Sequence, residues 1–159
     1  FKRACYSYHK LKNEYKFICE YPRHISIRGH CVVKLIDDNN KHSNQITLLS
    51  FGGCYEHTLM MKYVSVWSNT LNKSNELNNY NQWVLFTDNH NCTIIIERTT
   101  GDYGGVRAVI GRRNNHLLFI TYYPNKISVF NLNTFQFIKH DNLPIASCIK
   151  LGQEMIKNK

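Results

Sequence analysis

The chain has 159 residues, of which 43% are hydrophobic and 13% are aromatic. This composition provides enough apolar material for a packed core and excludes wholesale disorder. An excess of lysine and arginine gives a formal net charge of +9, which permits binding to nucleic acid or to an anionic lipid surface. The basic residues are mostly scattered singly, so the charge alone defines no site.

The sequence also constrains the cellular setting. No stretch approaches the roughly 18 apolar residues of a membrane helix, so no transmembrane segment is predicted. The first segment is charged and has no secretory signal, and we expect a cytoplasmic or nuclear location. The six cysteines include no CxxC pair, which predicts buried thiols and no zinc or disulfide framework. Because the sequence opens at Phe1, we expect a piece of a longer protein.

Short apolar and aromatic segments separated by polar turns run along the whole chain and predict an all-β fold. In chain order, the expected strands are residues 15–21, 30–36, 46–51, 62–68, 82–87, 92–97, 106–110, 117–122, 127–131 and 135–140. Residues 37–45, 112–116 and 124–126 are expected to be turns. Residues 68–81 predict an extended loop, and 99–105 predict a flexible link.

Aromatic residues recur at a fixed spacing. Tyr8 precedes Tyr15 by seven positions, and Phe130 precedes Phe137 by seven. We expect Trp67 and Trp83 to form the corresponding middle pair, with the loop between them as an insertion. Strand–turn–strand segments also repeat before these pairs. A repeat of four strands cannot bury both faces alone, so the units should stack like the blades of a propeller.

The segment LLSFGG, which ends at Gly52-Gly53, and the aromatic residues Trp67 and Trp83 resemble the kelch repeat. A second unit departs from that pattern, with Tyr122-Tyr123 in place of the double glycine and Phe137 in place of tryptophan. The resemblance implies a partial kelch-type β-propeller of about two four-stranded antiparallel blades, with incomplete blade edges at each end. The residues expected to serve this structure are Gly52, Gly53, Trp67, Trp83, Phe130, Phe137, Tyr8 and Tyr15.

The resemblance divides the chain into four parts. Residues 1–28 would end a preceding blade, and 29–90 would form a kelch-like blade with the long loop 68–81. Residues 91–144 would form a second, degenerate blade, and 145–159 would start a following one. A WD repeat is the alternative, because Gly29-His30 precedes Trp67-Ser68 at a suitable distance. No aspartate follows that tryptophan, and both alternatives give a propeller.

Catalytic motifs are not evident. The eight histidines form no HxH or HExxH pair, and the eleven acidic residues are mostly in turns without a paired arrangement. The segment TTGDYGG lacks the lysine of a phosphate-binding loop. One family of copper oxidases with a kelch propeller has tyrosine, cysteine and histidine around its metal, but nothing in the order of these residues here singles out ligands. We therefore expect no enzyme activity, no metal and no cofactor.

The kelch resemblance implies a non-catalytic protein–protein interaction module, an adaptor or scaffold that binds an unknown protein partner through its loops. The candidate partner-binding residues are Asp37, Asp38, His42, Tyr55, Glu56, His57, Asn72, Lys73, Asn79, Tyr80, Asp102 and Tyr103. The alternative is a basic propeller fragment that binds nucleic acid or anionic lipid, since lysines and arginines lie near Tyr6, Tyr8 and Tyr15. We rank this alternative second.

Overall fold

The computed structural model describes residues 3–35, 45–53, 57–67, 80–97, 102–111 and 115–144, and in these residues the fold is all-β, without helices. A two-stranded hairpin consists of β1 (Ala4–His9) and β2 (Glu14–Glu20). The first four-stranded sheet consists of β3 (His30–Leu35), β4 (Gln45–Gly52), β5 (Thr58–Val64) and β6 (Val84–Leu85). The second consists of β7 (Asp102–Gly111), β8 (Leu117–Tyr123), β9 (Lys126–Asn131) and β10 (Gln136–Asn142).

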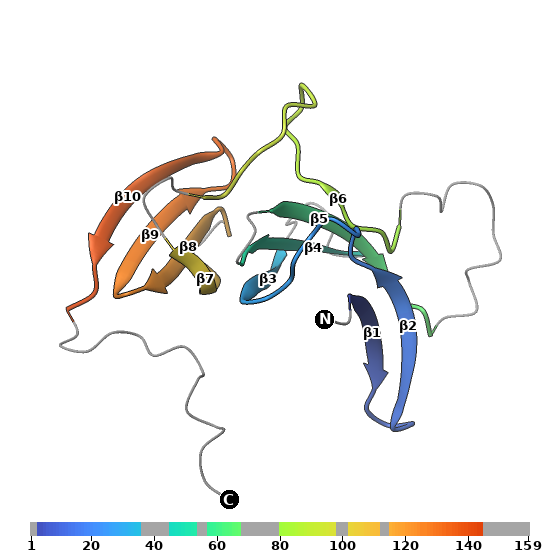
Figure 1. Ribbon diagram of the computed structural model, residues 1–159. Helices are drawn as coiled ribbons and strands as arrows, with labels where there is room; N and C mark the ends of the chain where they lie inside the picture. The colour runs from blue at the N-terminus through green and yellow to red at the C-terminus, as the bar shows by residue number, and fades with distance from the viewer. Residues whose placement is uncertain are drawn as a thin grey trace, which may run out of the picture.

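Within each sheet, every strand pairs antiparallel with the strand next to it in the sequence, and none of the three described sheets is closed (Figure 1). The all-β class predicted from the sequence is therefore confirmed, and so are the antiparallel sheets. A closed propeller is not seen in the described part of the chain.

Several boundaries differ from the sequence-based expectation. The strand expected at 92–97 is absent, and only a single bridge between Thr87 and Thr93 forms there. β1 was not expected, and β7 already begins at Asp102, inside the segment expected to be a flexible link. The glycines of that segment suggested a link, but Gly105 lies within the strand, where the backbone of Gly29, the residue before β3, approaches closely.

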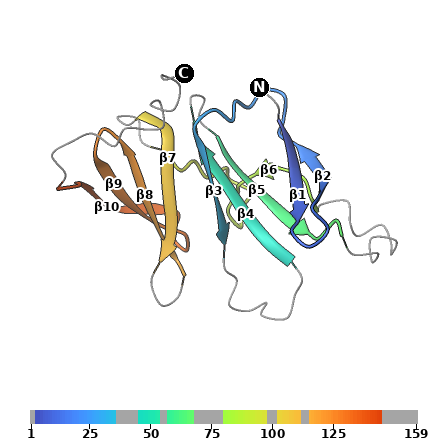
Figure 2. The ribbon, with the colours of Figure 1, turned by 90° about the horizontal axis from the view of Figure 1, so that it is seen from below.

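The two four-stranded sheets pack against each other with β3 and β7 side by side, while the β1–β2 hairpin lies on the other side of the first sheet (Figure 2). A core of fully buried side chains lies between the two sheets, including Leu49, Phe51, Ile96, Val106, Leu118, Ile120 and Phe130. A smaller core of Tyr21, Leu59, Met61 and Trp83 lies between the hairpin and the first sheet. Burial of these apolar surfaces supplies the main force that holds the three sheets together.

Glycine allows the two large sheets to approach closely at one point. Gly52 has a φ of 76°, and a Cβ atom there would lie 2.7 Å from Val106 Cγ1 on β7. Gly53, with a φ of 99°, donates its amide hydrogen bond to the carbonyl of Tyr103 at 3.1 Å. Only glycine adopts this backbone conformation without strain and leaves room for the neighbouring strand.

The seven-residue aromatic spacing has a direct structural basis. Tyr8 and Tyr15 are cross-strand partners in the first hairpin, and Phe130 and Phe137 are partners across β9 and β10. Their ring centroids are 4.8 Å and 5.1 Å apart, respectively. A spacing of seven therefore indicates a tight hairpin that pairs two aromatic residues on one face.

The expected middle pair, Trp67 with Trp83, does not form in this way. Met60 pairs with Val84 and Leu59 with Leu85, so Trp83 lies at the level of Met61 in this antiparallel register. Trp67 comes after the end of β5 and contacts the hairpin. The residue opposite Trp83 is therefore Met61, a methionine. Methionine can fill the space of an aromatic ring in a core, but a search for aromatic spacing in the sequence does not detect it.

Candidate interaction surface

Four aromatic rings cover the outward face of the β1–β2 hairpin, which we call the aromatic face. It consists of Tyr6, Tyr8, Tyr15 and Phe17, which are 58%, 48%, 72% and 53% exposed. Tyr6 and Phe17 meet edge to face at 5.8 Å, and Tyr8 and Tyr15 meet at 4.8 Å. Large exposed apolar patches are typical of sites that bind other molecules.

The period of a β-strand explains why these rings share one face. Tyr6 pairs with Phe17 and Tyr8 with Tyr15, with the pair Ser7–Lys16 between them pointing to the opposite face. The register shifts between Cys5 and Tyr6, so that residue 18 is passed over and Cys5 pairs with Cys19. The bulge lies beyond the two aromatic pairs, whose regular register places all four rings on one face.

The inward face of the hairpin is fixed by specific hydrogen bonds to the first sheet. Ser7 Oγ accepts hydrogen bonds from the Tyr63 hydroxyl at 3.2 Å and from Trp67 Nε1 at 2.9 Å. Trp83 Nε1 donates to Cys5 Sγ at 3.4 Å. These contacts from three separate residues hold the hairpin in one orientation, so the aromatic face is presented on a fixed support.

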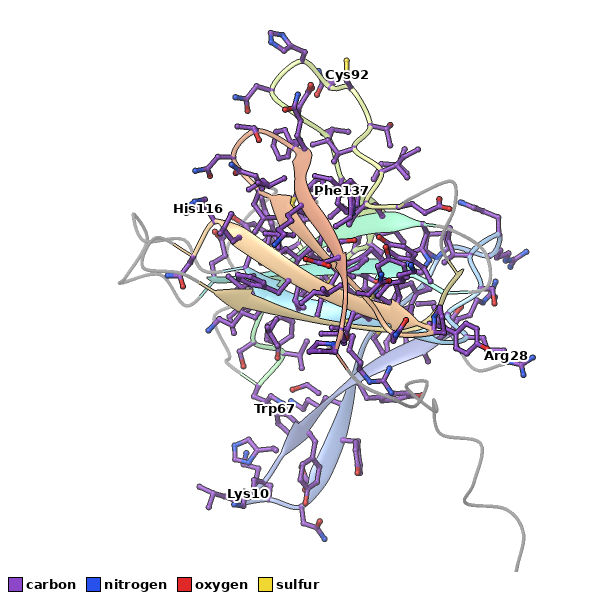
Figure 3. The ribbon with its side chains drawn as sticks, turned by 90° about the vertical axis from the view of Figure 1, so that its left-hand side faces the viewer. Lys10, Arg28, Trp67, Cys92, His116 and Phe137 are labelled. Carbon is purple, nitrogen blue, oxygen red and sulfur yellow. The ribbon has the colours of Figure 1, made fainter. Side chains whose placement is uncertain are left out.

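Lysines surround Trp67 on the inward side of the hairpin. Lys16 Nζ lies 4.8 Å and Lys12 Nζ 5.9 Å from the centre of the Trp67 ring, which places both in cation–π contact. The His9 ring packs edge-on against the same indole at 4.9 Å. Lys10 extends from the hairpin tip into solvent (Figure 3). The positive charge therefore gathers at the tip and inner side, next to the aromatic face and not on it.

Each four-stranded sheet also buries one serine within a polar network. Ser50 is fully buried, and its Oγ accepts a hydrogen bond from the Tyr21 hydroxyl at 3.1 Å and lies 2.9 Å from His57 Nε2. In the second sheet, Ser128 Oγ lies 3.0 Å from the Tyr122 hydroxyl and 2.8 Å from His140 Nδ1. Both serine oxygens are inaccessible to a substrate, so these groups satisfy one another and join neighbouring strands.

Of the twelve residues expected to bind a partner through loops, the structure describes four: His57, Tyr80, Asp102 and Tyr103. Asp37, Asp38, His42, Tyr55, Glu56, Asn72, Lys73 and Asn79 lie outside the described residues. His57 and Tyr103 are only 6% and 2% exposed, because His57 joins the Ser50 network and Tyr103 stacks on Tyr122. Tyr80 forms a single bridge with Lys62, and Asp102 begins β7. Neither His57 nor Tyr103 presents its side chain at a loop surface.

Of the residues expected to serve the structure, Gly52 and Gly53 lie at the contact between the two large sheets, and Trp83 and Phe130 are buried. Tyr8 and Tyr15 pair on the aromatic face. Sequence reasoning missed Phe17 as part of this surface, although the alternating patterns Tyr-Ser-Tyr and Tyr-Lys-Phe contain the signal. It also missed that Cys5 and Cys19 lie opposite each other.

Among the described residues, no group of three or more histidine, cysteine, aspartate or glutamate side chains is placed to hold a metal ion. In the same part of the chain, no helix has the length and apolar character needed to cross a membrane. In comparisons with known proteins, no family model, no curated protein and no solved structure matches the chain. The resemblance to kelch repeats thus stays a prediction from the sequence.

Proposed function

We propose that this chain is a non-catalytic protein-interaction module that belongs to a partial kelch-type β-propeller. Three observations support the architecture: consecutive strands form each four-stranded antiparallel sheet, the two large sheets pack with β3 beside β7, and a third, two-stranded unit packs on the first sheet. Glycines at the contact between the large sheets agree with a repeat that ends a strand in a double glycine. Stacked units of this kind give a rigid support for binding surfaces.

The observation that carries the function is the aromatic face. Tyrosine and phenylalanine are enriched in protein interfaces because each ring buries a large area at a small cost in conformational entropy. Here the pairs Tyr6–Phe17 and Tyr8–Tyr15 are already ordered by their ring contacts, so little further entropy is lost when a partner binds. A surface of this kind fits a protein partner that offers apolar side chains.

Binding to single-stranded nucleic acid is the second candidate, and one observation favours it. Exposed tyrosines stand beside Lys10, Lys12 and Lys16, and such a combination can stack bases and neutralise phosphates. However, Lys12 and Lys16 are directed to the Trp67 ring on the other side of the hairpin. This arrangement weakens the case for a phosphate track along the aromatic face.

The proposal can be tested with the double variant Tyr8→Ser, Tyr15→Ser in the full chain. Proteins retained by the immobilised wild-type chain are compared with those retained by this variant. We expect specific partners to be lost from the variant, because it removes one pair of rings from the aromatic face. The matched control is Tyr123→Ser, since Tyr123 is 47% exposed on the second sheet, away from the hairpin. Unchanged retention by the double variant would contradict the proposal.

A further inference from the structure

Cys5 and Cys19 are directly opposed in the β1–β2 hairpin, and both are free, half-buried thiols. Opposed residues of an antiparallel pair have Cα atoms about 4.5 to 5.5 Å apart. This separation falls within the range found for disulfide-bonded cysteines. The bulge next to Cys5 produces this pairing, since it brings Cys19, and not residue 18, opposite Cys5.

We propose that Cys5 and Cys19 form a redox-active dithiol, a modification site that a low-molecular-weight disulfide such as oxidised glutathione converts to a cross-strand disulfide. The pair is spaced far apart in sequence but adjacent in the hairpin, so the fold holds the two sulfur atoms at a high effective concentration. Neither cysteine is fully buried in the surrounding protein.

The surroundings of Cys5 favour its role as the attacking sulfur. Trp83 Nε1 donates a hydrogen bond to Cys5 Sγ at 3.4 Å, and the Cys19 thiol, whose Sγ lies 3.8 Å from Met61 Sδ, is the second group that can donate to a Cys5 thiolate. Both donors stabilise a thiolate and so lower the pKa of Cys5, with the larger effect from Cys19. The same hydrogen bond raises the pKa of Cys19, which keeps its proton while Cys5 is ionised. Thiolates are the nucleophiles in thiol–disulfide exchange.

The exchange has two steps. The Cys5 thiolate attacks one sulfur of oxidised glutathione, the sulfur–sulfur bond of glutathione breaks, and one glutathione thiolate leaves. Cys19 then loses its proton and its sulfur attacks Cys5 Sγ, which expels the second glutathione thiolate. Two protein thiols are oxidised to one disulfide, and one glutathione disulfide is reduced to two thiols.

Peptide mapping of the full chain tests the site directly. The chain is equilibrated with mixtures of oxidised and reduced glutathione, remaining thiols are blocked, and the protein is cleaved with trypsin. Cleavage at lysine and arginine separates residues 4–10, which contain Cys5, from residues 17–23, which contain Cys19. We expect these two peptides to be joined, with a mass two hydrogens below their sum, in a fraction that rises with the share of oxidised glutathione and disappears with dithiothreitol.

Two variants and one further condition make the result decisive. In Cys19→Ser, Cys5 should accumulate as a stable mixed disulfide with glutathione, whereas the matched variant Cys31→Ser should still form the linked peptide. In the wild-type chain unfolded with urea, the preference for this pair should be lost, because the hairpin no longer holds the sulfurs together. Cys92 lies at the end of the molecule opposite the hairpin tip (Figure 3) and reports on unselective oxidation. Absence of the linked peptide from the folded chain, or linkage of Cys5 to other cysteines at the same level, would overturn the proposal.

Discussion

The Cys5 sulfur interacts with two donors of different kinds, a thiol and an indole. The hydrogen bond from Cys19 makes the larger contribution and the one from Trp83 a smaller one, while burial acts in the opposite direction; together they lower the pKa of Cys5 to about 6. Burial raises the pKa of Cys31 and also that of the nearby Tyr21 hydroxyl, which stays neutral beside Cys5. The thiols of Cys5 and Cys31 should therefore ionise, and react, at different pH.

Because a lowered pKa means that the thiolate forms at lower pH, alkylation of Cys5 by iodoacetamide should reach its full rate near neutral pH. Cys31 should react only at higher pH, because its raised pKa keeps the Cys31 thiol neutral at neutral pH. Mass spectrometry of samples quenched between about pH 5 and about pH 9 measures both rates in one protein. A Cys5 rate that still rises above about pH 8, as expected for an unperturbed thiol, would refute this description of the site.

Trp83 is the residue with the largest expected effect on stability. It is buried between the hairpin and the first sheet, and its ring stacks on Tyr21 with centroids 4.7 Å apart. Trp83→Ala should lower the free energy of unfolding by about 3 to 5 kcal/mol. Urea denaturation measures the change. The control variant Trp67→Ala, at a half-buried position, should lose less of the free energy of unfolding. An unchanged denaturation curve for Trp83→Ala would show that this core is assigned incorrectly.

At the scale of elements, the hairpin depends on Ser7. Ser7→Ala would leave the Tyr63 hydroxyl and Trp67 Nε1 without their common acceptor. We expect a loss of about 1 to 2 kcal/mol in the free energy of unfolding, together with faster hydrogen exchange in β1 and β2. Tyr15→Phe is the control, because it removes an outward hydroxyl and should leave both measurements unchanged. Equal effects of the two variants would argue against a docking role for Ser7.

The sequence predicted those elements whose signal is local. Alternating apolar residues and polar turns located most strands, and the seven-residue spacing of Tyr8 and Tyr15 and of Phe130 and Phe137 proved to be cross-strand pairing. The spacing failed at Trp67 and Trp83, because Trp67 lies beyond the end of β5 and Trp83 lies at the level of Met61, which takes the place of an aromatic residue.

The candidate site depended on information that is not local. Cys5 pairs with Cys19 across the hairpin because of one bulge, and no pattern in the sequence predicts this bulge. Likewise, His57 and Tyr103 look like exposed polar or aromatic loop residues, yet both are buried because residues distant in sequence cover them. Gly105 looked like part of a flexible link, whereas it donates a hydrogen bond to the Gly29 carbonyl at 2.7 Å and joins the two sheets.

For the whole molecule, the arrangement of sheets and the overall charge support different partners. Two stacked sheets and a docked hairpin present the aromatic face on a fixed support, which favours a protein partner. The net charge of +9 favours a polyanion. Because a polyanion releases counterions when it binds, its affinity falls steeply as salt increases, whereas apolar contacts depend on salt only weakly.

The most direct test of the interaction-module account is retention of partners by the immobilised full chain at low and at high salt, with and without nuclease. The account predicts a discrete set of proteins that survives both nuclease and high salt and is lost in the Tyr8→Ser, Tyr15→Ser variant. Recovery of nucleic acid alone, released by high salt and unaffected by the double variant, would contradict it and would identify the chain as a basic nucleic-acid binder.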